Sequence, residues 1–105
     1  YVGLKDHPSY ELTLKQTTGF GGMISFKVKS AKIAAEALGK LKLVYFAESL
    51  GGVETLLTYP IEQTHAEAPK ELLARVGVDD RLLRLSVGIE DVEDLKEDLE
   101  QALAE

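Results

Sequence analysis

Nearly strict alternation of apolar and polar residues over residues 82–90 is the feature that most restricts the fold of this chain. One side of an extended chain there carries Leu83, Leu85, Val87 and Ile89. The opposite side carries Leu82, Arg84, Ser86, Gly88 and Glu90. This pattern predicts a strand that is buried on one face, so the other elements must cover that face.

The rest of the chain interleaves helical and extended patterns. Apolar spacing predicts helices at 10–17, 30–41, 70–76 and 92–103, and strands at 23–29, 43–47 and 53–59. Ser30 is a suitable N-cap for the second helix, and Thr64-His65-Ala66-Glu67 matches a capping box. We therefore predict one α+β domain over residues 1–105, with helices packed on one face of a largely antiparallel sheet.

Composition and charge exclude several classes of protein. A net charge of −6 argues against an unspecific grip on nucleic acid, which requires a basic face. Residues 90–105 hold eight acidic residues and one lysine, a pattern typical of a solvated helix face. No apolar run approaches the roughly 18 residues of a membrane span.

The absence of cysteine excludes a disulfide framework and a thiolate metal site, and it fits a reducing cytoplasm. The first ten residues contain Lys5, Asp6, His7 and Pro8 and lack the apolar segment of a secretory signal. The chain begins with Tyr1 instead of Met and is small for a complete enzyme, which indicates a piece of a longer protein or a processed product. The expected location is the cytoplasm.

Arg84 is the first candidate for a binding residue. On the predicted strand it leaves the sheet on the face away from the helices, where a guanidinium can hold a carboxylate with two parallel hydrogen bonds. Ser86 and Gly88 share that face and are small, so a ligand has room to approach the strand. The alternative is structural, with Arg84 paired to Glu48, Glu90 or another surface acid.

A second candidate segment is Glu48-Ser49-Leu50-Gly51-Gly52. The Ser49 hydroxyl and neighbouring backbone N–H groups can bind an anion, because glycines allow the main chain to come close. Two glycines between β-prone runs also fit a simple turn or bulge. Glu48 can contact a substrate ammonium or remain a solvated acid.

Other segments that contain chemically active residues have structural explanations. Gly19-Phe20-Gly21-Gly22 precedes a strand and has no Walker lysine, so it predicts a turn and not a phosphate loop. His7 and His65 are too far apart for a metal pair of the usual spacing. The lysines, including Lys15, Lys27, Lys40 and Lys42, are interpreted as surface charges.

Several blocks in order resemble the C-terminal domain of the Cys/Met-metabolism family of pyridoxal phosphate enzymes, which includes cystathionine γ-synthase and cystathionine β- and γ-lyases. The first blocks are Gly3-Leu4, His7-Pro8, Glu11-Leu12, Gln16 and Gly19-Phe20-Gly21-Gly22-Met23-Ile24-Ser25-Phe26. The later blocks are Glu48-Ser49-Leu50-Gly51-Gly52-Val53-Glu54, Tyr59-Pro60, Thr64-His65 and Leu83-Arg84-Leu85-Ser86-Val87-Gly88-Ile89-Glu90-Asp91. The resemblance runs almost end to end and implies the small domain of a fold-type I enzyme.

The resemblance implies roles for three residues. Arg84 would bind the substrate α-carboxylate, Ser49 would assist it, and Glu48 would help to select the distal end of the substrate. Pyridoxal 5'-phosphate would act as electron sink, held by a large domain that this chain lacks, so this segment would not catalyse alone. The implied reaction is cleavage of a C–S bond by a lyase, or formation of a C–S bond from activated homoserine and cysteine by a synthase. The resemblance also implies that the full-length enzyme is a homotetramer.

Two alternatives from other classes stay open from the residues. One is a free-standing interaction module that offers strand edges or its acidic helix to a protein partner. The other is a sensor domain that binds a free amino acid through Arg84 and Ser49 without chemistry. No residue pattern here separates β-chemistry from γ-chemistry, since both would use the same carboxylate-binding residues.

Overall fold

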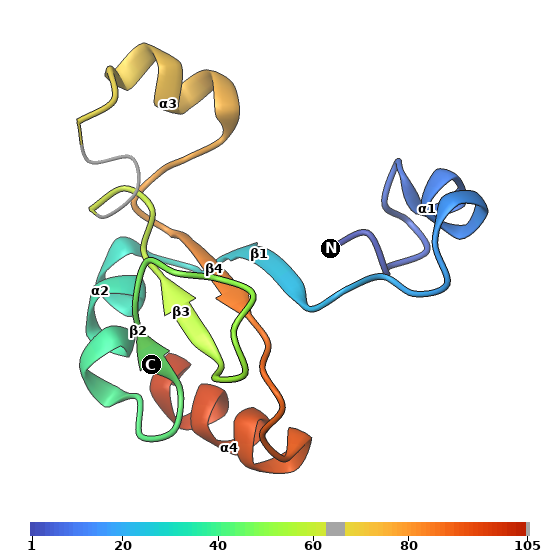
Figure 1. The fold of residues 1–105 in the computed structure, drawn as a ribbon. Helices are drawn as coiled ribbons and strands as arrows, with labels where there is room; N and C mark the ends of the chain where they lie inside the picture. The colour runs from blue at the N-terminus through green and yellow to red at the C-terminus, as the bar shows by residue number, and fades with distance from the viewer. Residues whose placement is uncertain (63–66, 105) are drawn as a thin grey trace.

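The computed structural model describes residues 1–62 and 67–104 (Figure 1). In chain order the elements are α1 (Tyr10–Gln16), β1 (Met23–Lys27), α2 (Ala31–Lys40), β2 (Tyr45–Phe46), β3 (Leu56–Thr58), α3 (Lys70–Val76), β4 (Leu82–Ser86) and α4 (Val92–Leu103). The predicted α+β class is confirmed. The predicted capping box at 64–67 falls largely outside the described residues.

The four strands form one sheet in the order β1-β4-β3-β2. β4 pairs antiparallel with both β1 and β3, and the short β2 pairs parallel with β3. The register places Leu57 of β3 opposite Leu85, and Thr58 opposite Arg84. Because side chains alternate across a strand, Leu57 and Leu85 lie on one face of the sheet while Thr58 and Arg84 lie on the other.

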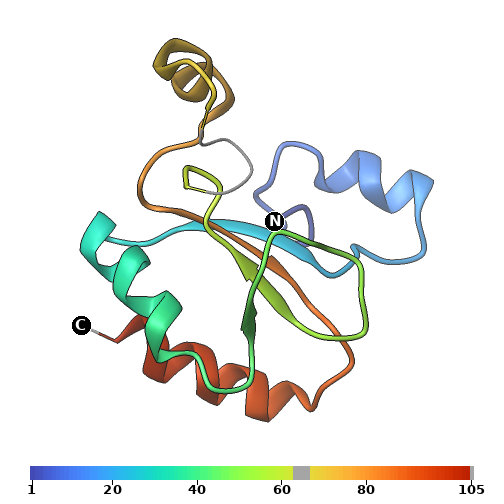
Figure 2. The same ribbon diagram turned by 60° about the vertical axis from the view of Figure 1, so that its left-hand side comes forward.

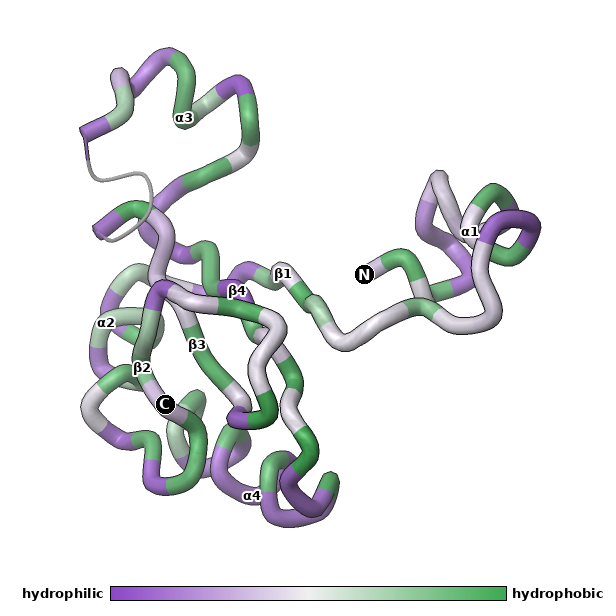
Figure 3. The backbone as a smooth tube through the Cα atoms, in the orientation of Figure 1, coloured by the Kyte–Doolittle hydropathy of each residue, from purple (hydrophilic) through white to green (hydrophobic). Residues whose placement is uncertain are grey.

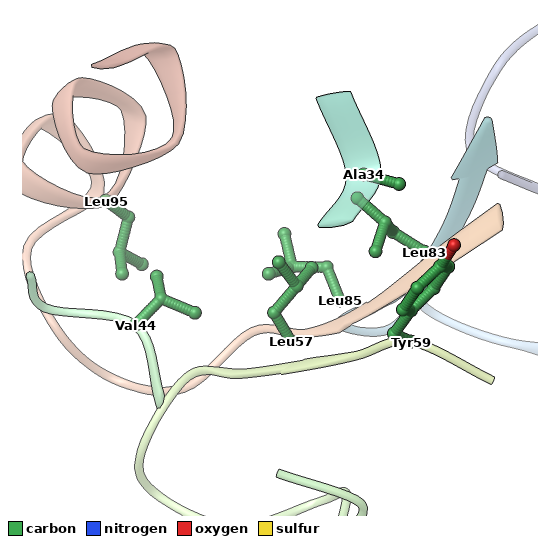
Figure 4. Close-up of a cluster of buried hydrophobic side chains, with 7 residues drawn as sticks. All are labelled: Ala34, Val44, Leu57, Tyr59, Leu83, Leu85 and Leu95. Atoms are coloured by element: carbon green, nitrogen blue, oxygen red, sulfur yellow. The ribbon is translucent and has the colours of Figure 1, made fainter. Parts of the chain in front are cut away.

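Two helices, α2 and α4, lie side by side over the apolar face of the sheet, whereas α1 and α3 lie outside this layer (Figures 1 and 2). The core between these layers is formed by Ala34, Val44, Leu57, Tyr59, Leu83, Leu85 and Leu95 (Figure 4). Charged residues alternate along α4 with the apolar residues that face this core (Figure 3). The helix layer therefore leaves the Arg84 face of the sheet for other contacts.

Local signals explain where the helices begin and end. The Ser30 hydroxyl caps α2 by accepting a hydrogen bond from the Ile33 N–H at 3.3 Å, as predicted. The Asp91 side chain caps α4. Gly77 ends α3 in the left-handed conformation with φ of 80°, which glycine adopts without steric cost. Among the described residues no helix combines the length and the apolar character needed to cross a membrane.

β4 is shorter than the alternation predicts. It ends at Ser86, and Ile89 is 81% exposed instead of facing the core. The reason is that the chain leaves the sheet ladder after Ser86, and the Gly88 and Ile89 N–H groups bond to residues 53–55. Alternation in the sequence predicts which side chains share a face, but it does not predict where pairing with the neighbouring strand ends.

Asp98 is an exception to the solvated helix face predicted for the acidic residues of 90–105. Its carboxylate is only 6% exposed and accepts the backbone N–H groups of Lys42, Leu43 and Val44 at 2.8–2.9 Å. The Gln101 side chain donates a further hydrogen bond. Burial by itself would raise the pKa of Asp98, but these hydrogen bonds outweigh it and hold the pKa below its ordinary value. Asp98 thus fastens α4 to the segment that leads into β2.

Candidate carboxylate-binding site

Arg84 lies in the middle of β4, between Ser25 of β1 and Thr58 of β3. Its neighbours along the strand, Leu83 and Leu85, are buried in the core, so the Arg84 side chain lies on the opposite face, as predicted. The side chain is half-buried. A rigid central strand therefore presents this guanidinium away from the helix layer.

The hydrogen-bond partners of Arg84 are neutral. Nη2 donates to the Glu48 backbone carbonyl at 2.8 Å and to the Thr58 hydroxyl at 3.3 Å. Nε is buried and has no hydrogen-bond partner within the described part of the chain. Neither the Glu48 nor the Glu90 carboxylate forms an ion pair with Arg84 in residues 1–62 and 67–104. Such a guanidinium retains an uncompensated charge and a free donor, which an added carboxylate would satisfy.

The β2–β3 loop (residues 47–55) covers this face of the sheet. The Thr58 hydroxyl donates to the Ala47 carbonyl at 2.5 Å, and the Gly51 N–H donates to the Ser86 hydroxyl at 2.9 Å. Thr58 and Ser86 are both buried, although they lie on the face opposite the helices. The loop and Arg84 are thus held against each other.

Ser49 and Glu48 lie on this loop with exposed side chains. The main chain of Glu48 contacts Arg84, while its carboxylate does not form an ion pair there. Ser49 lines a shallow hollow with Gly52, Val53 and Glu54, and Arg84 is not part of that lining. The structure therefore brings the three predicted residues into one region without a direct side-chain contact among them in the described residues.

The glycine pair lies in a bend of the β2–β3 loop. Gly51 adopts a φ of 76°, in the left-handed region that favours glycine. A change of chain direction at the pair agrees with the structural interpretation of these glycines, and the Gly51 N–H donates to the Ser86 hydroxyl.

The expectation that Ser86 and Gly88 leave room for a ligand is wrong. The Ser86 hydroxyl accepts the Gly51 N–H. A Cβ added at Gly88 would collide with the Val53 carbonyl and the Glu54 backbone, so the chain's own loop fills this space. The small residues permit close packing of the β2–β3 loop on the end of β4.

Thr58 also belongs to this region, although its sequence context did not predict it. Its hydroxyl donates to Ala47 and accepts from Arg84, so it links the loop to the guanidinium. A threonine inside the apolar run Leu56-Leu57-Thr58-Tyr59 was the available signal. Without the strand register, nothing placed it beside Arg84.

Other candidate chemistry is not supported in the described residues. No group of three or more potential ligands there could hold a metal ion. All the lysines are exposed, in agreement with their interpretation as surface charges. Gly21 adopts a φ of 77° before β1, and its carbonyl accepts a hydrogen bond from the Tyr1 hydroxyl.

Relatives at high identity cover nearly the whole chain. Cystathionine gamma-lyase from Bacillus subtilis is 52% identical over 103 residues, which is 98% of this chain and 27% of that protein. Cystathionine beta-lyase from Lactococcus lactis is 47% identical over the same 98% of this chain and 27% of its own length. This chain thus spans about a quarter of the length of the curated relatives it matches.

A solved structure shares the fold. The crystal structure of cystathionine gamma synthase from Xanthomonas oryzae, in complex with aminoacrylate and cysteine, matches with a TM-score of 0.92 at 42% identity. The match covers 98% of this chain and 27% of that one. The family described as Cys/Met metabolism PLP-dependent enzyme matches residues 1–104. On this evidence the chain belongs to the Cys/Met-metabolism family of pyridoxal phosphate-dependent enzymes.

Proposed function

We propose that this chain is the substrate-carboxylate-binding C-terminal domain of a pyridoxal phosphate-dependent transsulfuration enzyme. The whole protein would break or form a C–S bond in an amino acid such as cystathionine. The observation that supports this most is the half-buried Arg84 guanidinium, with neutral partners and an unpartnered Nε among the described residues. The names of the relatives supply the class of substrate.

Each site residue has a distinct task in this proposal. Arg84 holds the α-carboxylate of the substrate, and the strand on which it lies fixes the orientation of the reacting bond. Ser49 donates its hydroxyl to the same carboxylate. Glu48, exposed at the start of the β2–β3 loop, faces the distal end of the substrate and attracts its ammonium group.

The cofactor belongs to another part of the protein in this proposal. Pyridoxal phosphate enzymes hold the cofactor through a lysine, usually with a partner for the pyridine nitrogen. Every lysine here is exposed, and the described residues offer no enclosed site for a phosphate group, so they do not fit the cofactor. The relatives are almost four times as long as this chain, which supports a separate cofactor domain. In this proposal the full-length enzyme is a homotetramer located in the cytoplasm.

Replacement of Arg84 with lysine in the full-length protein tests this function. Lysine keeps the charge but loses the planar pair of donors, so we expect KM for L-cystathionine to rise by about tenfold or more. Steady-state kinetics measure this change. Arg75→Lys is the matched control because Arg75 is exposed on α3. An Arg84→Lys protein with the KM and kcat of the parent would overturn the proposed role.

Replacement of Ser49 with alanine is expected to have a smaller effect of the same kind. Loss of one hydrogen bond to a charged group costs about 1.5–3 kcal/mol when it is fully formed, so kcat/KM should fall by about 10- to 100-fold. The exposed Ser49 contributes no core packing, so the thermal midpoint should stay unchanged. A fall in thermal midpoint with unchanged kcat/KM would argue for a structural role instead.

A further inference from the structure

Thr55 and Glu90 are joined by two hydrogen bonds at the end of the β2–β3 loop. One oxygen of the Glu90 carboxylate accepts the Thr55 N–H at 2.8 Å, and the other accepts the Thr55 hydroxyl at 2.7 Å. The same hydroxyl accepts the Gly88 N–H at 2.8 Å. Thr55 is fully buried. We call this arrangement of Thr55, Gly88 and Glu90 the clasp.

The backbone beside the clasp is fixed at close range. The Ile89 N–H donates to the Val53 carbonyl at 2.9 Å. Gly88 packs so tightly on residues 53 and 54 that a side chain there would collide with their backbone. The loop is therefore packed closely on the end of β4.

Hydrogen bonds hold the loop in place, since its apolar side chains are not packed. Leu50 is 53% exposed and Val53 is 65% exposed. Exposed leucine and valine side chains contribute little to fixing a segment, because little apolar surface is removed from water. The position of the loop thus depends on the clasp, on the Gly51–Ser86 bond and on the contacts at Ala47 and Glu48.

Ser49 lies between these anchors. Its preceding residue is held by Arg84, and Gly51 is held by Ser86. The clasp fixes the far end of the loop at Thr55. If the clasp opened, Thr55 would lose its side-chain contacts with Gly88 and Glu90, and the place of Ser49 over the Arg84 face would be less firmly fixed.

We propose that Thr55 and Glu90 are positioning residues for the substrate, and that they act by setting the place of Ser49 over Arg84. This inference rests on the proposed carboxylate-binding function. Glu90 is suited to the task because a carboxylate accepts two donors from one residue at once. The hydrogen bond from the Thr55 backbone N–H, and to a smaller extent the one from its hydroxyl, hold the pKa of Glu90 below its ordinary value. This direction agrees with a Glu90 carboxylate that is charged when it accepts these bonds.

The decisive variant is Thr55→Val in the full-length protein. Valine has the shape of threonine but no hydroxyl to donate to Glu90 or to accept from Gly88, so the fold is retained while two of the three hydrogen bonds of the clasp are lost and only the backbone N–H bond to Glu90 remains. We expect KM for L-cystathionine to rise about tenfold, with a smaller change in kcat, because binding of the carboxylate is weakened before chemistry begins. Thr55→Ser keeps the hydroxyl and should restore the parent KM.

Hydrogen exchange followed by mass spectrometry gives a readout that does not depend on activity. Amide exchange in residues 48–55 should speed up in Thr55→Val and remain slow in α2 and α4. Glu90→Gln should show an intermediate increase. Glu100→Gln is the control, because Glu100 is an exposed acid of α4 and loses the same charge.

A double variant separates positioning from general destabilisation. In a Ser49→Ala background, Thr55→Val should change KM by less than about threefold, because the residue through which the clasp acts is gone. An equal effect of Thr55→Val in both backgrounds would overturn the inference, and so would unchanged KM and exchange. Failure of the underlying function would look different: Arg84→Lys would leave KM unaltered while exchange in residues 48–55 still responded to Thr55→Val.

Discussion

Replacement of Asp98 with alanine is expected to lower the free energy of unfolding of this chain by about 3–5 kcal/mol, since three backbone donors lose a charged acceptor. The donors are the N–H groups of Lys42, Leu43 and Val44, and Val44 is itself in the core. Alanine also unfastens α4 from the segment before β2. Urea unfolding monitored by circular dichroism measures the change.

Two further variants make the result interpretable. Asp98→Asn keeps one acceptor oxygen, so its free energy of unfolding should lie between those of the parent and of Asp98→Ala. Asp98→Asn therefore still gives a measurable unfolding transition if Asp98→Ala does not fold. Glu100→Ala removes an acid two positions away on the exposed side of α4, and should change stability by no more than about 0.5 kcal/mol. Equal stability of Asp98→Ala and Glu100→Ala would show that the three hydrogen bonds contribute nothing.

The contribution of Asp98 depends on pH with a defined sign. Folding lowers the pKa of Asp98 below its ordinary value of 3.8, so the folded state binds the proton less readily than the unfolded state. The stabilisation is fully present above 3.8 and is lost as the pH falls through the lower folded pKa. The difference in stability between the parent and Asp98→Asn should therefore narrow in that acidic range.

Replacement of Arg84 with alanine in the full-length protein is expected to reduce kcat/KM for L-cystathionine by about 10²–10³-fold, the cost of two charge-assisted hydrogen bonds. Most of the loss should be in KM, with a further fall in kcat because the reacting bond is less well oriented. The free energy of unfolding should change by no more than about 1 kcal/mol, because Arg84 bonds only to neutral groups through Nη2, and the buried Nε makes no hydrogen bond in the described chain.

The comparison of stability with activity separates the two explanations of Arg84. A structural arginine would lower stability and activity together. A residue kept for binding lowers activity alone, and natural sites often hold charged groups at some cost to stability. A large loss of stability with unchanged kcat/KM for Arg84→Ala would assign the residue to the fold.

Periodicity predicted the elements of this fold because helices and strands bury residues at fixed intervals. The helix at Lys70–Val76 matches to the residue, and the Ser30 cap is present as predicted. The strand containing Arg84 was located correctly, and with it the face on which the guanidinium lies. These features depend on residues that are close together in the sequence, so they could be predicted without the structure.

The features that were not predicted depend on contacts between distant segments. Asp98 looks like the other acids of its helix, and only the approach of residues 42–44 distinguishes it. Thr58 gains its role from the strand register, which places it opposite Arg84. Glu90 was considered as a partner for Arg84 and binds Thr55 instead, because the β2–β3 loop folds back on the end of β4.

The most direct test of the carboxylate-binding role compares two ligands in two proteins. KM is measured for L-cystathionine and for its analogue with a carboxamide at the reacting end, in the full-length parent and in Arg84→Ala. In the parent, KM should be about 100-fold lower, or lower still, for L-cystathionine than for the carboxamide, because the carboxamide cannot pair with the guanidinium charge. In Arg84→Ala the preference should shrink to within about threefold. A preference that persists undiminished without the Arg84 guanidinium would contradict the assignment of this residue to the substrate carboxylate.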